Sequence, residues 1–464
     1  MVLALALSWG AYSSSAPVGA QTSPQPNFVF ILADDMRYDD LAYMPKTRNL
    51  LASGGENFSR AYVAMPLCCP SRTSILTGMY THNHNVWFND NVSAGGWKEF
   101  KAQGHEQDNL ATRLSAAGYR TGLFGKYING YDGSSVPPDH QWADWFGLYT
   151  GDYYGWGVND NGTLRTYANT ASDYSTDVIS NEAQSFINAS VAQQRPFFAY
   201  VAPSAPHYPI TPAPRDLHTY DGLKAPRPPS FNEADVSDKP PWIRNLSKLS
   251  SSKIAQLDAR QEGRAETLQA LDDLVEGVVN TLDSAGVLNN TYVFFTSDNG
   301  FEMGEHRIFD GKREPYEEST RVPLLVRGPG VAAGSTTNKL VLNTDYLPTF
   351  TDLGGTQTPS YVNGRSLRPV LDGSATTSSW RSAILLETRF DSGTTRNFYG
   401  IRTSDEKKYV EYGGGFRELY DLSTDPYELS NTYSSSRPPT SLATRLQALK
   451  VCAGDSCRAA EDGP

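Results

Sequence analysis

Residues 27–35 of the chain read Asn27-Phe28-Val29-Phe30-Ile31-Leu32-Ala33-Asp34-Asp35. An uninterrupted apolar run, without alternation of polar and apolar residues, predicts a strand that is buried on both faces. Comparable runs lie at 121–125, 196–202 and 291–297, and Leu and Val recur on one helical face through 265–282. Strands that alternate with helices in this way predict an α/β fold, with a large, mostly parallel sheet sandwiched by helices.

The pattern changes near residue 373. Short strand-like pieces follow at 383–387, 398–403, 408–412 and 420–422. We therefore predict a main domain over 24–372 and a smaller C-terminal α+β subdomain over 373–464 that contains an antiparallel sheet. A Pro-rich stretch at 208–253 has no sustained periodicity. Such a segment is typical of a rim or lid over a site, or of a passive surface insertion.

Net charge and the distribution of apolar residues argue against some classes of protein. The chain has 464 residues and a formal net charge of −11. Without a long Lys/Arg run, this charge argues against a nucleic-acid binder, and any anionic substrate needs a local positive site. Residues 1–20 hold a short apolar run and then small residues, which predicts a signal peptide. No other segment is apolar for long enough to span a bilayer, so we expect a secreted, luminal or periplasmic protein.

Two of the four cysteines, Cys452 and Cys457, lie close together near the C-terminus. In an oxidising compartment such a pair is expected to close a small disulfide loop, the alternative being two free surface thiols. Six Asn-x-Ser/Thr sequons permit glycosylation of a secreted chain, and they begin at Asn57, Asn91, Asn161, Asn188, Asn245 and Asn289.

Polar side chains follow two of the predicted strands directly. Asp34 and Asp35 end the first, and Asp298 and Asn299 end the strand at 291–297. Because ligands of open α/β sheets bind beyond the carboxyl ends of the strands, we expect these four side chains to meet there. Carboxylate and amide oxygens are the ligands that Ca²⁺ and Mg²⁺ prefer. Taken singly, each pair would more often be a turn or a helix cap.

A second informative stretch reads Cys68-Cys69-Pro70-Ser71-Arg72-Thr73-Ser74-Ile75-Leu76-Thr77-Gly78. Pro70 suits the first turn of a helix over about 70–79, which would place Cys68 near a helix N-terminus where anions are stabilised. Adjacent cysteines alone could be small buried hydrophobes or disulfide partners. The whole stretch resembles the signature of type I sulfatases of the alkaline-phosphatase superfamily, Cys-x-Pro-Ser-Arg followed after three positions by Leu-Thr-Gly.

That resemblance implies an alkaline-phosphatase-like fold and a covalent modification. In the family, a formylglycine-generating enzyme oxidises the first Cys, here Cys68, to formylglycine, whose hydrate is the nucleophile toward the sulfur of a sulfate ester. The resemblance also implies that Asp34, Asp35, Asp298 and Asn299, with the modified Cys68, hold a divalent cation. Calcium is favoured by the resemblance, while the ligand types alone do not separate Ca²⁺ from Mg²⁺.

Three further residues match family positions. Arg72, inside the signature, corresponds to the Arg that binds formylglycine and the metal carboxylates. His207, in Ala205-Pro206-His207, resembles the His that contacts sulfate and protonates the leaving oxygen, although a lone His after a strand is usually structural. Lys312 matches a second sulfate-binding Lys, where an isolated Lys would normally be solvated.

Lys126 corresponds to another family Lys, but the motif around it departs from the family. The family often reads Gly-Lys-Trp-His-Leu-Gly, whereas this chain has Ile128 at the His position. Asn129 cannot act as a base, so the group that takes the proton during sulfate elimination stays open. N-acetylglucosamine-6-sulfatases also lack this His, and several other segments of the chain resemble that group.

Three histidines outside these motifs, His82, His84 and His306, are candidates for the rim of the site, or simple surface histidines. The resemblance predicts hydrolysis of sulfate monoesters, with a sulfated sugar such as N-acetylglucosamine 6-sulfate, or aryl sulfates, as substrate. One alternative is a phosphatase or phosphonate monoester hydrolase on the same scaffold. Another is a non-catalytic binder of sulfated glycans.

Overall fold

Side chains of strand β1 (Asn27–Ala33) enter two different hydrophobic cores. Phe28, Phe30 and Leu32 pack in one core, and Val29, Ile31 and Ala33 pack in the other. Successive side chains of a strand point to opposite faces, so an unbroken apolar run requires cover on both sides. The predicted α/β sandwich is therefore confirmed. The computed structural model describes residues 25–137, 141–376, 379–390 and 393–463, so the predicted signal peptide lies outside the described residues.

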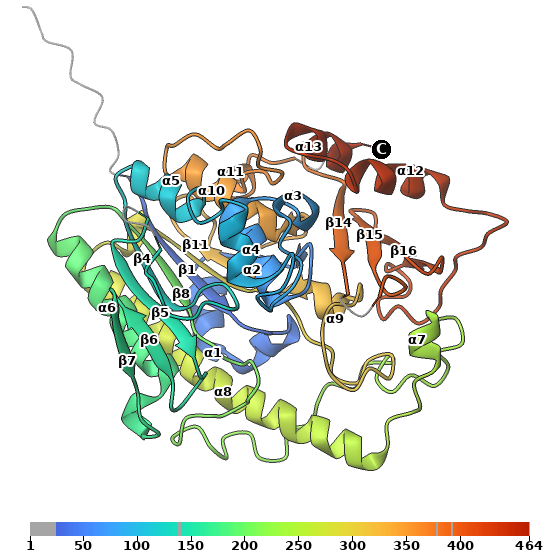
Figure 1. The fold of residues 1–464 in the computed structure, drawn as a ribbon, viewed down its shortest axis with the longest axis horizontal. Coiled ribbons are helices and arrows are strands. Elements are labelled where there is room, and N and C mark those ends of the chain that lie inside the picture. The colour runs from blue at the N-terminus through green and yellow to red at the C-terminus, as the bar shows by residue number, and fades with distance from the viewer. Residues whose placement is uncertain (1–24, 138–140, 377–378, 391–392, 464) are drawn as a thin grey trace, which may run out of the picture.

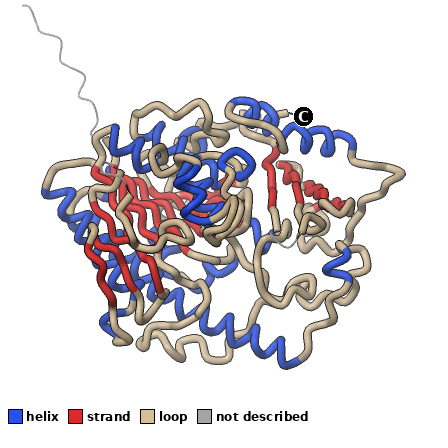
Figure 2. Tube along the Cα trace, viewed as in Figure 1, coloured by secondary structure: helices blue, strands red, loops and turns tan. Residues whose placement is uncertain are grey.

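The main sheet has ten strands (Figures 1 and 2). Its centre, β9-β1-β8-β4-β5, is parallel. On either side of this centre β11 and β6 pair antiparallel with it, and β7 pairs antiparallel with β6. In spatial order the strands are β12 (Ser335–Thr337), β2 (Glu56–Phe58), β11 (Leu324–Arg327), β9 (Thr291–Ser297), β1, β8 (Phe197–Ala202), β4 (Arg120–Lys126), β5 (Asp144–Thr150), β6 (Gly157–Asp160) and β7 (Thr163–Thr166). A small sheet contains β10 (Arg321–Val322), β3 (Ala61–Tyr62) and β13 (Val341–Leu342).

Helices cover both faces of the main sheet (Figure 1). The first core includes residues of α2 (Cys68–Thr77), α5 (Leu110–Ala116) and α10 (Tyr346–Leu353). The second includes residues of α6 (Ser175–Ala192) and α8 (Ser251–Ser284). The other α-helices are α1 (Pro45–Thr47), α3 (Thr81–His84), α4 (Gly96–Ala102), α7 (Pro241–Arg244), α9 (Glu317–Thr320), α11 (Arg368–Leu371), α12 (Thr440–Leu449) and α13 (Asp455–Asp462). Short 3₁₀ or π turns occupy Asp39–Tyr43, Arg48–Ala52, Ala171–Asp173, Leu288–Asn290 and Asn343–Asp345.

The C-terminal part forms the predicted antiparallel sheet. Its order is β14 (Ala383–Thr388), β15 (Phe398–Thr403), β16 (Lys407–Tyr412) and β17 (Arg417–Asp421).

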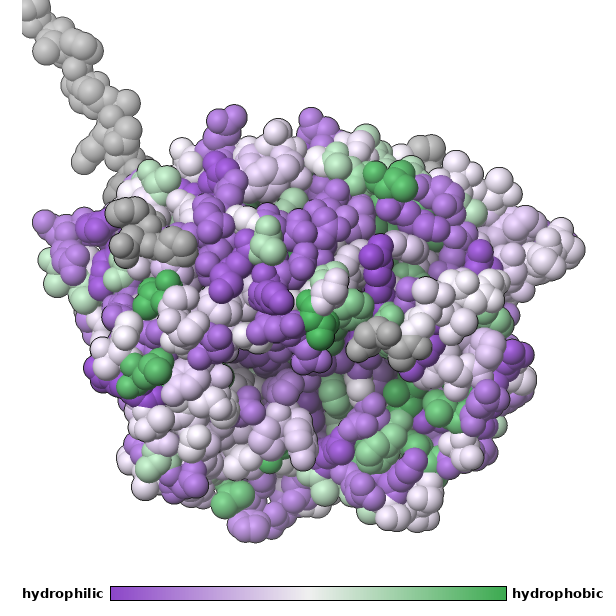
Figure 3. Space-filling view, in the orientation of Figure 1, coloured by the Kyte–Doolittle hydropathy of each residue, from purple (hydrophilic) through white to green (hydrophobic). Residues whose placement is uncertain are grey.

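Cys452 and Cys457 form a disulfide, as predicted, while Cys68 and Cys69 are free. No helix in the described part of the chain is both long and apolar enough to cross a membrane. The face in Figure 3 is mostly hydrophilic, with separate apolar patches.

Candidate active site

The loops after three neighbouring strands are joined by backbone hydrogen bonds at the carboxyl edge of the sheet. The Asp298 amide, after β9, donates to the Ala33 carbonyl at 3.1 Å, and the Asp35 amide donates to Asp298 Oδ1 at 3.1 Å. The Asp34 amide donates to the carbonyl of Ala205, which lies after β8, at 3.1 Å. Parallel strands deliver these loops to one edge, so residues more than 250 positions apart meet as the sequence predicts.

The four predicted metal-site residues are buried and in contact. Asn299 Nδ2 donates to Asp35 Oδ1 at 2.7 Å, while Asn299 Oδ1 is buried without a hydrogen-bond partner. Burial, reinforced by the Asp34 carboxylate, raises the pKa of Asp298. An unpartnered amide oxygen beside three buried carboxylates is costly in an empty interior and suits a hard cation. The donor set of Asp34, Asp35, Asp298 and Asn299 therefore fits Ca²⁺ or Mg²⁺.

Cys68 is the first residue of α2, which begins two residues before the predicted start. Its Sγ lies 3.6 Å from Asp34 Oδ1 and 3.8 Å from Asp35 Oδ1. Lys312 Nζ is 2.8 Å from the same sulfur. Burial raises the pKa of the Cys68 thiol well above its usual range, with Lys126 and Lys312 opposing the shift. The side chain at position 68 therefore stands between the carboxylates and a lysine.

Three cations neutralise the three carboxylates. Arg72 Nε donates to Asp298 Oδ2 at 2.8 Å, and its Nη1 donates to the Lys126 carbonyl at 2.9 Å. Lys126 Nζ pairs with Asp34 Oδ2, and Lys312 Nζ pairs with Asp35 Oδ1. Because these charges cancel, a divalent cation entering the cluster would leave a local positive charge for an anionic substrate.

His207 faces the same cluster. Its Nε2 lies 3.7 Å from Asp35 Oδ2, and 29% of the side chain is exposed. Its Nδ1 is buried and has no hydrogen-bond partner. Tyr153 fixes the backbone beside it by donating its hydroxyl hydrogen to the His207 carbonyl at 2.8 Å. A partly exposed imidazole beside a charged cluster is placed to meet a ligand that enters from solvent.

The position of the missing family His belongs to the core. Ile128 is 2% exposed and packs in the first hydrophobic core. The carbonyl of Asn129 accepts a hydrogen bond from the Trp97 amide at 2.7 Å. Neither residue supplies a base to the cluster. A nearby acid that the sequence interpretation missed is Asp152, which lies just beyond β5. Burial raises the pKa of Asp152, while His207 and Lys126 oppose the shift.

The structure corrects the interpretation of His84 and His306 as rim residues, because both are fully buried. His84 lies 3.1 Å from Ser74 Oγ and accepts a hydrogen bond from the Val86 amide. His306 Nδ1 lies 2.7 Å from Glu233 Oε2. The His306 partner lies 73 residues away in sequence and the two His84 partners lie nearby, but the burial of both rings depends on tertiary packing.

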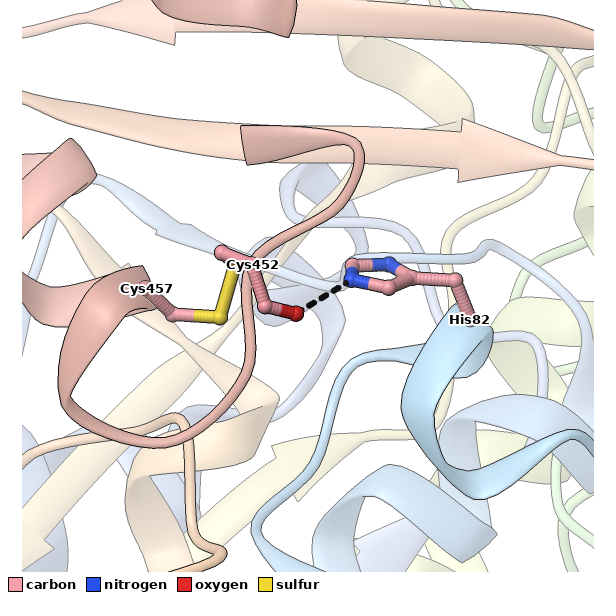
Figure 4. A group of neighbouring side chains, drawn as sticks. All are labelled: His82, Cys452 and Cys457. Atoms are coloured by element: carbon pink, nitrogen blue, oxygen red, sulfur yellow. Dashed lines mark hydrogen bonds between the residues drawn. A yellow bond between two sulfur atoms is a disulfide. The ribbon is translucent and has the colours of Figure 1, made fainter. Parts of the chain in front are cut away.

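His82 contacts the C-terminal part of the chain instead of the catalytic cluster. Figure 4 shows its ring facing the Cys452 carbonyl, with 3.0 Å between Nε2 and the oxygen. Its Nδ1 is 3.0 Å from Glu387 Oε2. The two cysteine sulfurs near His82 are bonded to each other, so they are not thiolate ligands for a metal.

Arg264 is a supporting residue that the sequence interpretation also missed. Asp35 has a left-handed backbone conformation, with φ of 62°. Arg264 Nη2 donates to the Asp35 carbonyl at 2.7 Å and to Asp40 Oδ2 at 2.6 Å. Arg264 therefore holds an unfavourable backbone geometry in place. A charged residue four positions before Leu268, on the buried face of α8, was the available signal.

Residues 26–356 match the sequence profile of the family described as Sulfatase. The chain belongs to the sulfatase family. Residues 304–450 of this family member also match the profile described as N-sulphoglucosamine sulphohydrolase, C-terminal. That profile covers Lys312 and β14 to β17.

Curated relatives of this sulfatase family member differ in length. Human N-acetylglucosamine-6-sulfatase is 34% identical over 94% of this chain and 86% of its own length. The extracellular sulfatase SULF-1 homolog of Drosophila melanogaster is 39% identical over 78% of this chain, but the match spans only 33% of that protein. An arylsulfatase of Volvox carteri is 34% identical over 96% of this chain and 77% of its own length.

Solved structures at lower identity share the fold. BT4656, in complex with its substrate D-glucosamine-2-N,6-O-disulfate, superposes with a TM-score of 0.75 at 24% identity, covering 94% of this chain and 99% of that chain. The phosphonate monoester hydrolase of Agrobacterium radiobacter gives a TM-score of 0.69 at 22% identity, with 94% and 95% of the two chains covered. One scaffold thus carries two kinds of named protein, and fold alone does not choose between them.

Proposed function

We propose that the protein is a divalent-metal-dependent sulfuric ester hydrolase that cleaves the S–O bond of sulfate monoesters. The observation that carries the proposal is the place of Cys68, at the first residue of α2 and in contact with two predicted metal ligands and Lys312. A binder of sulfated glycans has no need for a buried thiol at that point.

The nucleophile would be formylglycine made from Cys68. The Cys68 sulfur occupies the place that an oxygen of the hydrated aldehyde would take, between Lys312 and the carboxylates. The hydrate supplies two hydroxyls on one carbon, one to attack sulfur and one to expel sulfate, so water need not attack a crowded anionic centre. Asp34, Asp35, Asp298 and Asn299 would hold the cation, with Ca²⁺ favoured, and the bound ion would act as a Lewis acid.

The chain's own side chains bind and orient the sulfate. Lys312 reaches position 68 and also pairs with Asp35, while Lys126 uses one described hydrogen bond, to Asp34. Both ammonium groups therefore keep N–H donors for sulfate oxygens. Arg72 is fully buried between Asp298 and Lys126 and fixes the geometry of the carboxylates. His207 would give a proton to the leaving oxygen, because it is the imidazole beside the cluster that solvent and a substrate can reach.

The substrate we propose is a sulfated sugar such as N-acetylglucosamine 6-sulfate, or an aryl sulfate. Curated relatives that match most of the chain carry N-acetylglucosamine-6-sulfatase and arylsulfatase names. We also propose a catalytic domain over 24–372, a C-terminal subdomain over 373–464, and secretion of the protein. The buried disulfide and the extracellular relatives support an oxidising compartment.

Replacing Cys68 tests the nucleophile. We expect Cys68→Ala to lower turnover of nitrophenyl sulfate by about 10⁴- to 10⁶-fold, the range for loss of a catalytic nucleophile. Cys69→Ala is the matched control, because this buried neighbour packs in the core and should retain activity. Mass spectrometry of the peptide that contains residue 68 should detect formylglycine. An unmodified thiol in fully active protein would refute the proposed chemistry.

Metal removal tests the proposed metal site, and a phosphate ester tests the phosphatase or phosphonate hydrolase alternative. Dialysis against a chelator should abolish sulfate release, and added Ca²⁺ or Mg²⁺ should restore it, because the carboxylate cluster would lose its cation. Activity that survives complete metal removal would exclude the metal site. Faster cleavage of nitrophenyl phosphate than of nitrophenyl sulfate would favour the phosphatase or phosphonate hydrolase alternative.

A further inference from the structure

An arginine from the C-terminal part of the chain lies beside the catalytic motif. Arg389 follows β14, and its guanidinium carbon is 3.9 Å from the centroid of the Trp87 ring. Trp87 is 1% exposed and packs with Leu67, the residue that precedes Cys68. The ring is therefore a fixed platform, which places the Arg389 head close to the start of α2.

The loop that carries Lys312 touches the same place. Lys312 extends to the Cys68 sulfur, at 2.8 Å, whereas the adjacent Arg313 donates from Nη2 to the Arg389 carbonyl. The Arg313 guanidinium also lies 4.3 Å from the Phe390 ring centroid. Consecutive residues thus link the catalytic cluster to the segment after β14, so Arg389 stands at the edge of the same site.

The charge of Arg389 is not balanced by a described carboxylate. Its neighbour Arg396 has an ion pair with Glu314, at 2.6 Å, but among the described residues no acidic side chain pairs with Arg389. Stacking covers one face of a guanidinium and leaves its N–H edge free to donate two parallel hydrogen bonds. In a chain of net charge −11, an exposed cation that has no acidic partner in the described part of the chain, at the edge of the proposed sulfate site, attracts a second anionic group.

We propose that Arg389 binds a second anionic group of the substrate, an N-sulfate or a carboxylate on the sugar that carries the hydrolysed sulfate or on its neighbour. The inference deepens the proposed function and rests on it. Arg389 is then a specificity-determining residue. It distinguishes doubly charged sugars from singly charged ones, because only a doubly charged sugar has a second anionic group to accept hydrogen bonds from the free N–H groups of the guanidinium. Trp87 is the residue that positions it.

The test compares substrates across matched variants. Values of kcat/KM are measured for nitrophenyl sulfate, N-acetylglucosamine 6-sulfate, glucosamine 2-N,6-O-disulfate and a uronate-containing glucosamine 6-sulfate disaccharide. We expect Arg389→Gln to lower kcat/KM for one of the two doubly charged sugars by about 10- to 100-fold more than for the singly charged ones. The sugar that is affected identifies the group as N-sulfate or carboxylate. Arg437→Gln, which removes the same charge from an exposed loop, should match the wild type on every substrate.

Two kinetic results would overturn the proposal, and so would one binding result. An equal loss on all four substrates would mean that Arg389 only shapes the catalytic cluster, and no loss on any would mean that it does not meet the substrate. Binding separates this failure from failure of the proposed function. In the Cys68→Ala background, calorimetry should show that one of the two doubly charged sugars binds more weakly after Arg389→Gln, whether or not the wild type hydrolyses it. Unchanged affinity for both sugars refutes the assignment.

Discussion

Two lysines, the buried Lys408 and the partly buried Lys312, show how differently the same side chain is used in this protein. Lys408 Nζ, on β16, donates to the Pro315 carbonyl at 3.0 Å and lies 2.9 Å from both Glu317 and Glu428. Its ammonium group thus has three polar partners within 3.0 Å, and the side chain is 0% exposed. Lys312 is 14% exposed and has two described partners, Asp35 and Cys68.

The side chains around the two lysines also differ in how completely their polar atoms are paired. The Lys408 cluster also contains Arg402, whose Nε lies 3.3 Å from Glu317. Each cation of this cluster is therefore paired with at least one carboxylate. In the cluster at the strand ends, Asn299 Oδ1 is buried and has neither a hydrogen-bond nor an ion-pair partner among the described residues, whereas Glu428 Oε1 of the Lys408 cluster, which also accepts no hydrogen bond, lies 2.9 Å from the Lys408 ammonium. Native interiors rarely tolerate an atom like this Asn299 oxygen unless a ligand satisfies it. Lys408, enclosed by three polar partners, is structural, and we propose that Lys312, which has two described partners and lies in the cluster with the unpartnered Asn299 oxygen, is placed for a ligand.

The largest expected effect on stability is at Lys408. Lys408→Met should lower the free energy of unfolding by about 3–5 kcal/mol, because it leaves Glu317 and Glu428 charged and buried. Urea unfolding measures this loss, and the remaining folded enzyme should keep its kcat. Lys407→Met is the control: its pair with Asp421 lies at the surface and should be worth about 1 kcal/mol or less. Equal losses for the two variants would remove the distinction between a closed cluster and the surface.

The opposite result is expected at Lys312. Lys312→Met should lower kcat/KM for nitrophenyl sulfate by about 10²- to 10³-fold, the range for a lost charge-stabilising donor. With Ca²⁺ present the melting temperature should change little, since the cation still balances Asp35. Lys98→Met, at an exposed position, serves as the control. If Lys312→Met were unstable but fully active per folded molecule, Lys312 would be a structural residue like Lys408.

A smaller effect is expected at His82, which joins α3 to the C-terminal part. Burial and the nearby Arg389 oppose protonation, but the Glu387 carboxylate and the Cys452 carbonyl raise the pKa of His82 above 6.5. The imidazolium therefore contributes stability that is fully present below pH 6.5 and is lost as pH rises through the folded-state pKa.

His82→Gln should be less stable than the wild type by roughly 1.5–3 kcal/mol at low pH, with the gap closing as pH rises. Urea unfolding from about pH 5 to about pH 9 follows the titration. A gap that does not change with pH would show that packing, and not the charge of His82, joins the two parts.

The ends of strands were predictable where a charged residue directly follows an apolar run. The apolar run of β1 stops at Asp34 and that of β9 stops at Asp298, and both observed strands end one residue earlier, as predicted. The helix α8 was predicted only over 265–282 because its first turns are largely exposed and polar, although the helix starts at Ser251. An exposed polar helix lacks the apolar periodicity on which such a prediction depends.

The sequence by itself determined the family, the alternation of strands and helices, and the side chains available for metal and sulfate. A short motif and the order of apolar runs carry that information locally. Only the tertiary structure decided which similar side chains reach the carboxylate cluster: His207 lies beside Asp35 and is partly exposed, whereas His84 and His306 are fully buried elsewhere, and Lys312 joins the cluster while Lys408 is enclosed in the C-terminal part. Burial and pairing depend on segments far apart in the chain, and each such segment reaches its partner only when the sheet brings the strand ends together.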